Sequence, residues 1–373
     1  MRNIGVIGQN SEFVSEFSAH ADNAVSGLDK ACFIPFEMEQ GNDTGMSGET
    51  KTTSEERGDG MLLSNYGKIS GRCVKFNLHL IEGCNYHCRH CYAKFNSRKI
   101  LSFDNWKNIV DNCIDAVPDC SFNIAGGEPL MAPYFNSLVN YCHERGRKVS
   151  VITNGSMITD AWIVKNAPML DTFGLSLDSF NAETLVRMGR CTRTGKILTA
   201  ERIRAITHAV KAVNPACNIK VNTVVCSLNK NETVRDDILD MPVSRWKIFK
   251  MMSFANDSFN NFDISVTDEE YMRYIRNNLG VPPEEINGKS SRIFKLSDSC
   301  SAVVEKNLDG GYLMIDACGD LVDNTRNTSY VPVVNCITGN VREGLNRLAF
   351  NSELYWSRYT DSSGDMSNSR IAA

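Results

Sequence analysis

The chain has 373 residues, of which 42% are hydrophobic and 23% are charged, and its formal net charge is −4 with an isoelectric point near 5.9. This composition is typical of a globular protein, and it lacks the basic excess that proteins binding polymeric nucleic acid usually show. No stretch approaches the roughly eighteen consecutive apolar residues of a membrane span, and residues 1–10 lack a signal-peptide pattern, so we expect a cytoplasmic protein without a membrane segment. We also expect a monomer, although no sequence pattern indicates the oligomeric state.

The two ends of the chain are predicted to lie outside the folded domain. From Glu39 to Gly60 the only apolar residue is Met46, so residues 1–70 are predicted to be a disordered or weakly ordered extension. The Ser-rich residues 361–373 are predicted to be a disordered tail. Between them we expect a core domain over residues 71–290 and a C-terminal extension over residues 291–360 that covers the substrate.

Strand-like and helix-like runs alternate along the core. Six strands are predicted, at Val74–Leu80, Ser121–Ile124, Lys148–Thr153, Thr172–Leu177, Asn218–Val225 and Arg245–Met251. The clearest helix is Ala200–Val213, capped by Thr199, with one apolar face made of Ile203, Ile206, Val210 and Val213. Six strand–helix units in series predict an α/β fold, a closed or partial (β/α)6 barrel. Because chemistry in such folds sits at the carboxyl ends of the strands, we expect every motif below to lie there.

Three cysteines directly follow the first predicted strand, in the run Cys84-Asn-Tyr-His-Cys88-Arg-His-Cys91. Cytosolic thiols stay reduced, so clustered cysteines usually bind metal or take part in catalysis. Three thiolates on a [4Fe–4S] cluster leave one iron open to the amino and carboxylate groups of S-adenosylmethionine (SAM). We therefore predict Cys84, Cys88 and Cys91 as cluster ligands. Most of the other eleven cysteines are expected to be small buried side chains.

A zinc site is the alternative for this loop. His87 and His90 lie within it, and three cysteines with one histidine are a structural zinc set. The chain would then be a non-enzymatic zinc-binding module. The loop lacks the paired C-x2-C modules of a zinc ribbon or finger, and a zinc site leaves the following motifs unexplained.

Further motifs follow the second, third and fourth predicted strands. The two glycines of Gly126-Gly127-Glu128-Pro129 let the backbone approach a ligand closely, which suits the amino group of SAM. The residues predicted to bind SAM are Gly126, Gly127, Glu128, Asn154, Ser176 and Arg190. Two alternatives stay open, because Asn154 also fits an ordinary Asn-Gly turn and Arg190 also fits a solvated surface position.

The fifth and sixth predicted strands carry cations. Side chains two apart on a strand point the same way, so Lys220 faces with Asn222, and Arg245 faces with Lys247. Buried cations are costly without a partner, so three converging ones need an anion of comparable charge, and a triphosphate supplies it. The alternative is an outward-facing, solvated pair. Alternation argues against it, because Trp246 is then expected to face the helix layer.

Together these motifs resemble the radical SAM superfamily and, within it, the viperin family. The resemblance runs from about Val74 to Val322. Beyond the shared motifs it rests on Asn77-x-His79, Ser176-x-Asp178-Ser179-Phe180, Gly189-Arg190, Lys220-x-Asn222, Arg245-Trp246-Lys247-x-Phe249 and Tyr312-Leu-x-x-Asp316. The sequence departs from the family at Ser121 and Ala125, where the family has a lysine and a serine.

The resemblance implies a radical SAM lyase that dehydrates a nucleoside triphosphate to its 3′-deoxy-3′,4′-didehydro form, a chain terminator in antiviral (antiphage) defence. It favours CTP, with UTP or GTP as alternatives, and an electron donor of the flavodoxin or ferredoxin type. It implies substrate contacts from Asn77, Lys220, Asn222, Arg245 and Lys247. It also implies a catalytic role for Tyr312, which would pass a proton or an electron to the substrate, although a core tyrosine in a strand is the alternative.

A radical SAM peptide-modifying enzyme is the remaining alternative. Many such enzymes carry extra clusters in a Cys-rich C-terminal domain. Here Cys300, Cys318 and Cys336 are far apart and form no second C-x2-C motif, which disfavours this interpretation.

Overall fold

The computed structural model of the chain describes residues 73–92, 100–256, 259–281, 291–306, 308, 310–325 and 330–359. All of them belong to the unit Leu63–Ala373. The predictions made for residues 1–70 and 361–373 lie outside the described residues.

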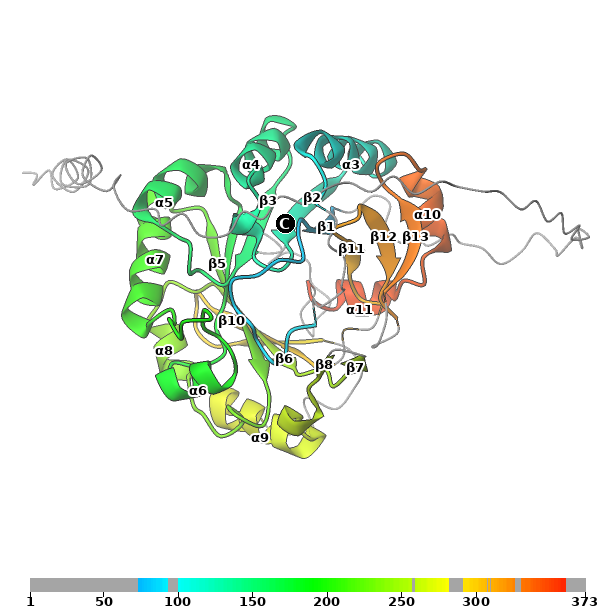
Figure 1. Cartoon of the computed structure of the whole chain (residues 1–373). Helices are drawn as coiled ribbons and strands as arrows, with labels where there is room; N and C mark the ends of the chain where they lie inside the picture. Colours follow the sequence, from blue (N-terminus) through cyan, green and yellow to red (C-terminus); the bar gives the residue numbers. More distant parts are fainter. Residues whose placement is uncertain are drawn as a thin grey trace, which may run out of the picture. The chain divides into compact units, whose positions relative to one another are not determined.

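Six parallel strands follow one another in chain order through the centre of a single open sheet (Figure 1). They are β1 (Val74–His79), β2 (Cys120–Ala125), β3 (Val149–Thr153), β4 (Thr172–Ser176), β5 (Asn218–Val225) and β6 (Arg245–Lys250). The ends of each strand lie within one residue of the predicted bounds. The predicted partial (β/α)6 barrel is confirmed.

Helices surround this arc of strands (Figure 1). The α-helices are α3 (Phe103–Ala116), α4 (Phe135–Glu144), α5 (Asp160–Asn166), α6 (Ala182–Arg187), α7 (Ala200–Val213), α8 (Arg235–Leu239) and α9 (Asp268–Leu279), and short 3-10 turns lie at η2 (Pro129–Met131), η3 (Ala167–Met169) and η4 (Phe262–Ile264). Helix α7 has the predicted bounds, and the hydroxyl of Thr199 accepts a hydrogen bond from Arg202 N at 3.3 Å. Its buried face contains Ile203, Ile206 and Val210, whereas Val213 is exposed.

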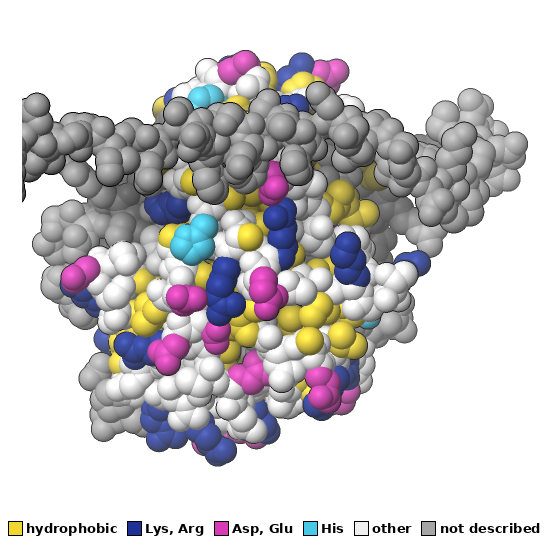
Figure 2. Space-filling view, turned by 90° about the vertical axis from the view of Figure 1, so that its left-hand side faces the viewer, with side chains coloured by type: hydrophobic (Ala, Val, Ile, Leu, Met, Phe, Trp, Pro, Cys, Tyr) yellow, Lys and Arg dark blue, Asp and Glu magenta, His cyan; other side chains and the backbone are white. Residues whose placement is uncertain are grey.

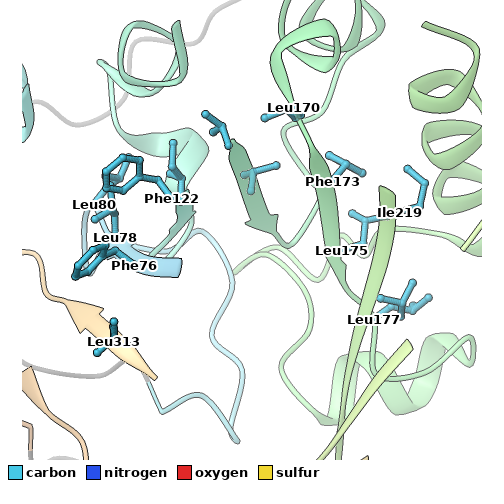
Figure 3. Packing of buried hydrophobic residues seen from close by; sticks show 14 of the residues in the cluster. Phe76, Leu78, Leu80, Phe122, Leu170, Phe173, Leu175, Leu177, Ile219 and Leu313 are labelled. Atoms are coloured by element: carbon cyan, nitrogen blue, oxygen red, sulfur yellow. The ribbon is translucent and has the colours of Figure 1, made fainter. Parts of the chain in front are cut away.

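The strands separate an apolar outer face from a polar inner face. Phe76 and Leu78 of β1 are fully buried beside Phe122 of β2 (Figure 3), and the rings of Phe76 and Phe122 stack with centroids 6.3 Å apart. Trp246 and Ile248 of β6 are likewise buried on the outer side, as the alternation predicts. The inner face instead carries polar side chains, among them Lys75, Asn77, Asn123, Ser150, Thr172, Asn218, Lys220, Arg245 and Lys247.

The residues after 290 lengthen the sheet at both edges. Beyond β6 lie β10 (Ser301–Glu305), which is parallel to β6, and β9 (Arg292–Lys295). Beyond β1 lie β11 (Leu313–Ile315), which is parallel to β1, then β12 (Asp320–Asp323) and β13 (Val331–Asn335). The remaining elements are the β7 (Ala255–Asn256) and β8 (Phe259–Asn260) ladder and the helices α10 (Val341–Arg347) and α11 (Ser352–Trp356). The predicted extension therefore forms both outer parts of the sheet, and its covering role stays a prediction.

The outer face over α5, α7 and α8 mixes charges of both signs (Figure 2). Arg202 of α7 pairs with Asp160 of α5 at 3.2 Å, and Arg204 pairs with Asp237 of α8 at 2.5 Å. Such exposed pairs add little to stability.

Across the described ranges, no helix combines the length and the apolar character that crossing a membrane requires.

Candidate active site

The cysteine loop leaves the carboxyl end of β1, and N–H donors point at its sulfur atoms. Cys84 Sγ lies 3.4 Å from Tyr86 N and 3.8 Å from Asn154 Nδ2, and Cys88 Sγ lies 3.4 Å from Arg190 Nη1. All three cysteines of the motif are free of disulfide bonds. N–H donors stabilise thiolate sulfur, which is the form that binds iron, so the loop fits the predicted cluster.

The described residues contain no group of three or more His, Cys, Asp or Glu side chains arranged to hold one metal ion. Ligands of a four-iron cluster bind different iron atoms, so they stand farther apart than the ligands of a single ion. The assignment of Cys84, Cys88 and Cys91 as ligands stays a prediction.

The predicted SAM-binding glycines lie directly on the cysteine loop. Gly127 N donates to Ile81 O at 2.7 Å, and Glu128 N donates to Gly83 O at 2.8 Å. A Cβ on Gly127 would lie 2.1 Å from Gly83 O, so only glycine fits there. Gly126 has a φ of 140°, which also favours glycine. The two glycines therefore hold the loop in place, whatever ligand they approach.

Glu128 is fully buried and fastens this turn to the end of β3. Its carboxylate accepts hydrogen bonds from the Thr153 hydroxyl at 2.7 Å, from Asn154 N at 2.8 Å and from Leu130 N at 3.2 Å. Burial raises the pKa of Glu128, although these hydrogen bonds oppose the increase. Both oxygens are occupied by donors of this chain, so Glu128 positions Asn154, and a direct contact with SAM stays a prediction.

Asn154 combines the two roles considered for it. It opens an Asn-Gly turn in which Gly155 has a φ of 78° and Ser156 N donates to Asn154 Oδ1 at 2.9 Å. Its amide also donates to Asn85 Oδ1 at 2.8 Å within the cysteine loop. The turn thus brings Asn154 beside Cys84.

Arg190 is buried, so the alternative of a solvated surface residue is wrong. Its guanidinium donates to the backbone carbonyl of Ser176, forms an ion pair with Asp178 at 2.9 Å and reaches the sulfur of Cys88. Burial alone would raise the pKa of Asp178, but Arg190 and His90 outweigh it and lower the pKa. The predicted Ser176 and Arg190 are therefore in contact, through the backbone of Ser176.

The predicted cations line a cavity on the inner face of the barrel. Lys220, Arg245 and Lys247 line it together with Asn77 and Tyr312. Lys220 is the third residue of β5 and Arg245 the first of β6, so these side chains lie near the amino ends of their strands. The expectation that every motif lies at the carboxyl ends is wrong for them. Cysteines and cations mark opposite ends of the same barrel.

The strand register explains why the cations converge. Lys220 is opposite Arg245, and Asn222 is opposite Lys247, in the parallel β5–β6 ladder. Opposite residues share a face of the sheet, so both pairs point inward. Asn222 lies two residues after Lys220, nearer the carboxyl end of β5, and is not among the residues that line the cavity.

Sequence reasoning missed two further cations of this cavity, Lys75 and Arg358. Lys75 lies two residues before Asn77 on β1, so the alternation rule applied to the other strands would have found it. Its ammonium donates to Ser150 Oγ at 3.3 Å. Arg358 follows α11, and no local sequence pattern marks it.

Lys220 has no hydrogen-bond or ion-pair partner within the described ranges. Burial, followed by the nearby charges of Lys247 and Lys75, holds the pKa of Lys220 well below its usual range. Gly174 on β4 leaves room for its stem, because a Cβ on Gly174 would lie 3.3 Å from Lys220 Cε. An unpaired cation in such a position favours binding of an anion.

Lys247, by contrast, is balanced inside the protein by Glu305 of β10. Lys247 Nζ lies 2.5 Å from Glu305 Oε1, and Glu305 Oε2 pairs with Arg358 Nε at 2.7 Å. Burial alone would raise the pKa of Glu305, but Arg358 and Lys247 lower it to about 2. Burial lowers the pKa of Lys247 to about 8. Glu305 carries one negative charge against the two cations that it contacts, so it offsets only part of the positive charge of the cavity.

Tyr312 belongs to the same network. It immediately precedes β11, and its hydroxyl donates to Glu305 Oε2 at 2.7 Å and accepts from Lys247 Nζ at 3.2 Å. The guanidinium of Arg358 lies 4.0 Å from the centre of its ring. Burial raises the pKa of Tyr312 well above its usual range. Tyr312 thus lies one residue before the strand and is half-buried beside the cavity, and its catalytic role stays a prediction.

An open parallel barrel with a three-cysteine loop after its first strand and a double-glycine turn against that loop defines a radical SAM protein. Residues 78–240 match the model of the Radical SAM superfamily. The fold resembles anSMEcpe with bound AdoMet and a peptide, with a TM-score of 0.55 at 16% identity over 78% of this chain and 84% of that one. It also resembles Streptococcus suis SuiB, with a TM-score of 0.53 at 14% identity over 76% and 67% of the two chains.

Within that superfamily, the chain belongs to the viperin-like S-adenosylmethionine-dependent nucleotide dehydratases. A protein of this name from Selenomonas ruminantium is 30% identical over 76% of this chain and 98% of its own length. Another, from Psychrobacter lutiphocae, is 28% identical over 80% of this chain and 98% of its own length. The chain is therefore a radical SAM enzyme that acts on nucleotides, with SAM and a [4Fe–4S] cluster as cofactors. The zinc-module and peptide-modifying alternatives are not supported.

Proposed function

We propose that the substrate is a nucleoside triphosphate, CTP in preference to UTP or GTP, and that the product is its 3′-deoxy-3′,4′-didehydro form. The observation that carries this proposal is the cationic cavity at the amino ends of the strands. Five cationic side chains line it: Lys75, Lys220, Arg245, Lys247 and Arg358. Arginine offers a planar fork and lysine a point charge to phosphate oxygens, so the set suits a chain of phosphates.

The direction of the barrel supports this orientation of the substrate. With its phosphates among the cations, the nucleotide extends along the inner face toward the carboxyl ends of the strands. Its ribose then approaches the cysteine loop, the glycine turn and Asn154. Close positioning is essential, because a carbon radical reacts with almost any neighbouring C–H bond.

The chemistry divides between the cofactors and the chain. Bound SAM and the reduced cluster supply a carbon radical that removes the 4′ hydrogen, after which the 3′ hydroxyl leaves as water with one further electron and a proton. The residues of this chain bind the phosphates and orient the ribose. Tyr312 lines the cationic cavity, so its role as a proton or electron source for the ribose rests on the family resemblance.

The biological role follows from the product. A nucleotide without a 3′ hydroxyl cannot be extended by a polymerase, so the proposed product terminates chains in antiviral or antiphage defence. The preference for CTP and a flavodoxin or ferredoxin donor rest on the family resemblance.

The test is an anaerobic assay of the cluster-loaded protein with dithionite, SAM and either CMP or one of the four ribonucleoside triphosphates. Mass spectrometry is expected to show loss of water from CTP in step with formation of 5′-deoxyadenosine, and little turnover of CMP. Cleavage of SAM with no dehydration of any nucleotide would overturn the proposal. Dehydration of CMP as fast as CTP would overturn the role of the cationic cavity.

A further inference from the structure

We propose that Arg190 and Asp178 set the reduction potential of the cluster. Arg190 does so by donating a hydrogen bond to the sulfur of Cys88, and Asp178 by holding Arg190 in that position. This inference rests on the predicted ligation by the cysteines and is independent of the nucleotide substrate.

The guanidinium of Arg190 is fixed by a different partner at each nitrogen. Nη1 lies 3.4 Å from Cys88 Sγ, Nε lies 2.9 Å from Asp178 Oδ2, and Nη2 donates to the carbonyl of Ser176. Arg190 is only 8% exposed. Because the fork is planar and rigid, the two contacts away from the sulfur determine where the third N–H points.

Asp178 is buried and contacts both Arg190 and the cysteine loop. It is 2% exposed, and its Oδ1 accepts a hydrogen bond from Val224 N of β5 at 2.7 Å. Its Oδ2 lies 3.3 Å from Nε2 of His90, a residue of the cysteine loop. The same carboxylate thus ties Arg190 and the loop to the barrel.

The backbone also brings Arg190 to the loop. His87 N donates to Gly189 O at 3.3 Å, and Arg89 N donates to Met188 O at 2.9 Å. A Cβ on Gly189 would lie 2.6 Å from His87 O, so only glycine permits this approach. The backbone hydrogen bonds between residues 87–89 and residues 188–189 therefore hold Arg190 close to the sulfur of Cys88.

A hydrogen bond to a ligand sulfur affects the two oxidation states differently. When one electron from the donor converts the cluster from its 2+ to its 1+ state, the sulfurs become more negative and accept the hydrogen bond more strongly. The reduced state is stabilised, so the potential rises. Burial keeps this interaction from being screened by salt.

The test is a redox titration of the cluster-loaded protein without SAM, with dithionite and mediator dyes, in which the reduced cluster is measured by electron paramagnetic resonance. Arg190→Gln is expected to lower the ratio of reduced to oxidised cluster about tenfold at a fixed solution potential, which is a shift of about 59 mV for one electron. Asp178→Asn is expected to shift the potential in the same direction. Leaving SAM out separates this effect from any contact that Arg190 makes with SAM.

Arg89→Gln is the matched control. Arg89 lies next to Cys88 and carries the same charge, but it is 39% exposed and pairs with Asp263. Its substitution is expected to leave the potential unchanged. Potentials equal to that of the parent in Arg190→Gln and Asp178→Asn would overturn the inference, as would an equal decrease in Arg89→Gln.

Iron content and visible absorbance are measured first, because they distinguish a failure of the predicted cysteine ligation from a failure of the role proposed for Arg190. A parent protein without a cluster would refute the ligation on which the inference depends. If Arg190→Gln alone fails to load, Arg190→Lys replaces it, because lysine keeps the charge but its single nitrogen lacks the planar fork that spans these three partners. Its potential is expected to fall below that of the parent, and an unchanged value would overturn the inference.

Discussion

Lys220 and Arg245 lie directly opposite each other on β5 and β6, so two cations from neighbouring strands enter one cavity side by side. Like charges placed this way destabilise a sheet. Lys220 has no anionic partner within the described ranges, and the buried Nε of Arg245 has no hydrogen-bond acceptor there. The pair is therefore unfavourable electrostatically in the free protein, and a bound anion would relieve it.

Lys220→Met is expected to stabilise the free protein and to weaken substrate binding. Removing an unpaired, desolvated cation lowers the energy of the empty cavity, so the melting temperature should rise. A charge-assisted contact to phosphate is worth about 1.5–3 kcal/mol, so the dissociation constant for a nucleoside triphosphate should rise roughly ten- to hundredfold.

Calorimetry measures both effects, and Lys165→Met on α5 is the control, because Lys165 is exposed and its loss changes the net charge equally. The control should change neither quantity. Unchanged affinity in Lys220→Met would refute the phosphate assignment.

We expect Lys247 to make the protein more stable, but its affinity for the nucleotide weaker, as the pH rises. Burial lowers the pKa of Lys247 from 10.5 to about 8 on folding, so between these values the unfolded chain binds a proton that the folded chain lacks. The free energy of unfolding contributed by Lys247 therefore rises with pH from about 8 to 10.5. Over the same window Lys247 loses its charge, so affinity for the triphosphate falls.

Urea titrations and binding measurements at pH 7, 8, 9 and 10 check this expectation. Lys247→Met serves as the reference, because the difference between parent and variant isolates the contribution of this one group. A difference that stays constant across the series would contradict it.

Gly127→Ala is expected to displace the cysteine loop and to abolish cluster loading. The new Cβ would lie 2.1 Å from Gly83 O, a backbone atom that cannot move away without the loop. Iron content per chain and visible absorbance after anaerobic reconstitution give the measurement. Gly83→Ala tests the neighbouring glycine, whose added Cβ meets only Ile81 Cδ1 at 4.0 Å, and it should still load. Full loading of Gly127→Ala would show that the turn tolerates a side chain.

Cys88→Ala should abolish cluster binding and SAM cleavage while the fold is kept. Cys226→Ala, which removes another buried thiol just after β5, should retain full iron content. Circular dichroism confirms folding, and iron analysis with detection of 5′-deoxyadenosine gives the outcome. Stoichiometric iron in Cys88→Ala would remove this cysteine from the ligand set.

The central strands were predictable because each has a local signal. Alternation along Arg245–Lys250 separates cations from Trp246 and Ile248, and the capping residue Thr199 marks the start of α7. The cysteine loop and the glycine turn are contiguous motifs, so their residues could be named from the sequence.

The position of the cavity along the barrel and the pairing of Glu305 with its cations were not predictable in the same way. Glu305 meets Lys247 and Arg358 across 58 and 53 residues of chain, and only pairing of β10 with β6 brings them together. Sequence spacing also says that Lys220 and Asn222 share a face, but not how far along the barrel a ligand would reach them.

The order of strands has a consequence for the assembly of the enzyme during synthesis. Strands β10 and β11 are consecutive in the chain but join opposite edges of the sheet, and β11 pairs with β1 across more than 230 residues. Such distant pairing forms late, whereas domains begin to fold from their N-terminal part as they emerge from the ribosome. A nascent chain that has reached β6 already contains the cysteine loop, the glycine turn and Arg190. It still lacks Glu305, Tyr312 and Arg358. The residues of the cluster site are therefore all synthesised while the cationic cavity still lacks Arg358 and the Glu305 that pairs with Lys247.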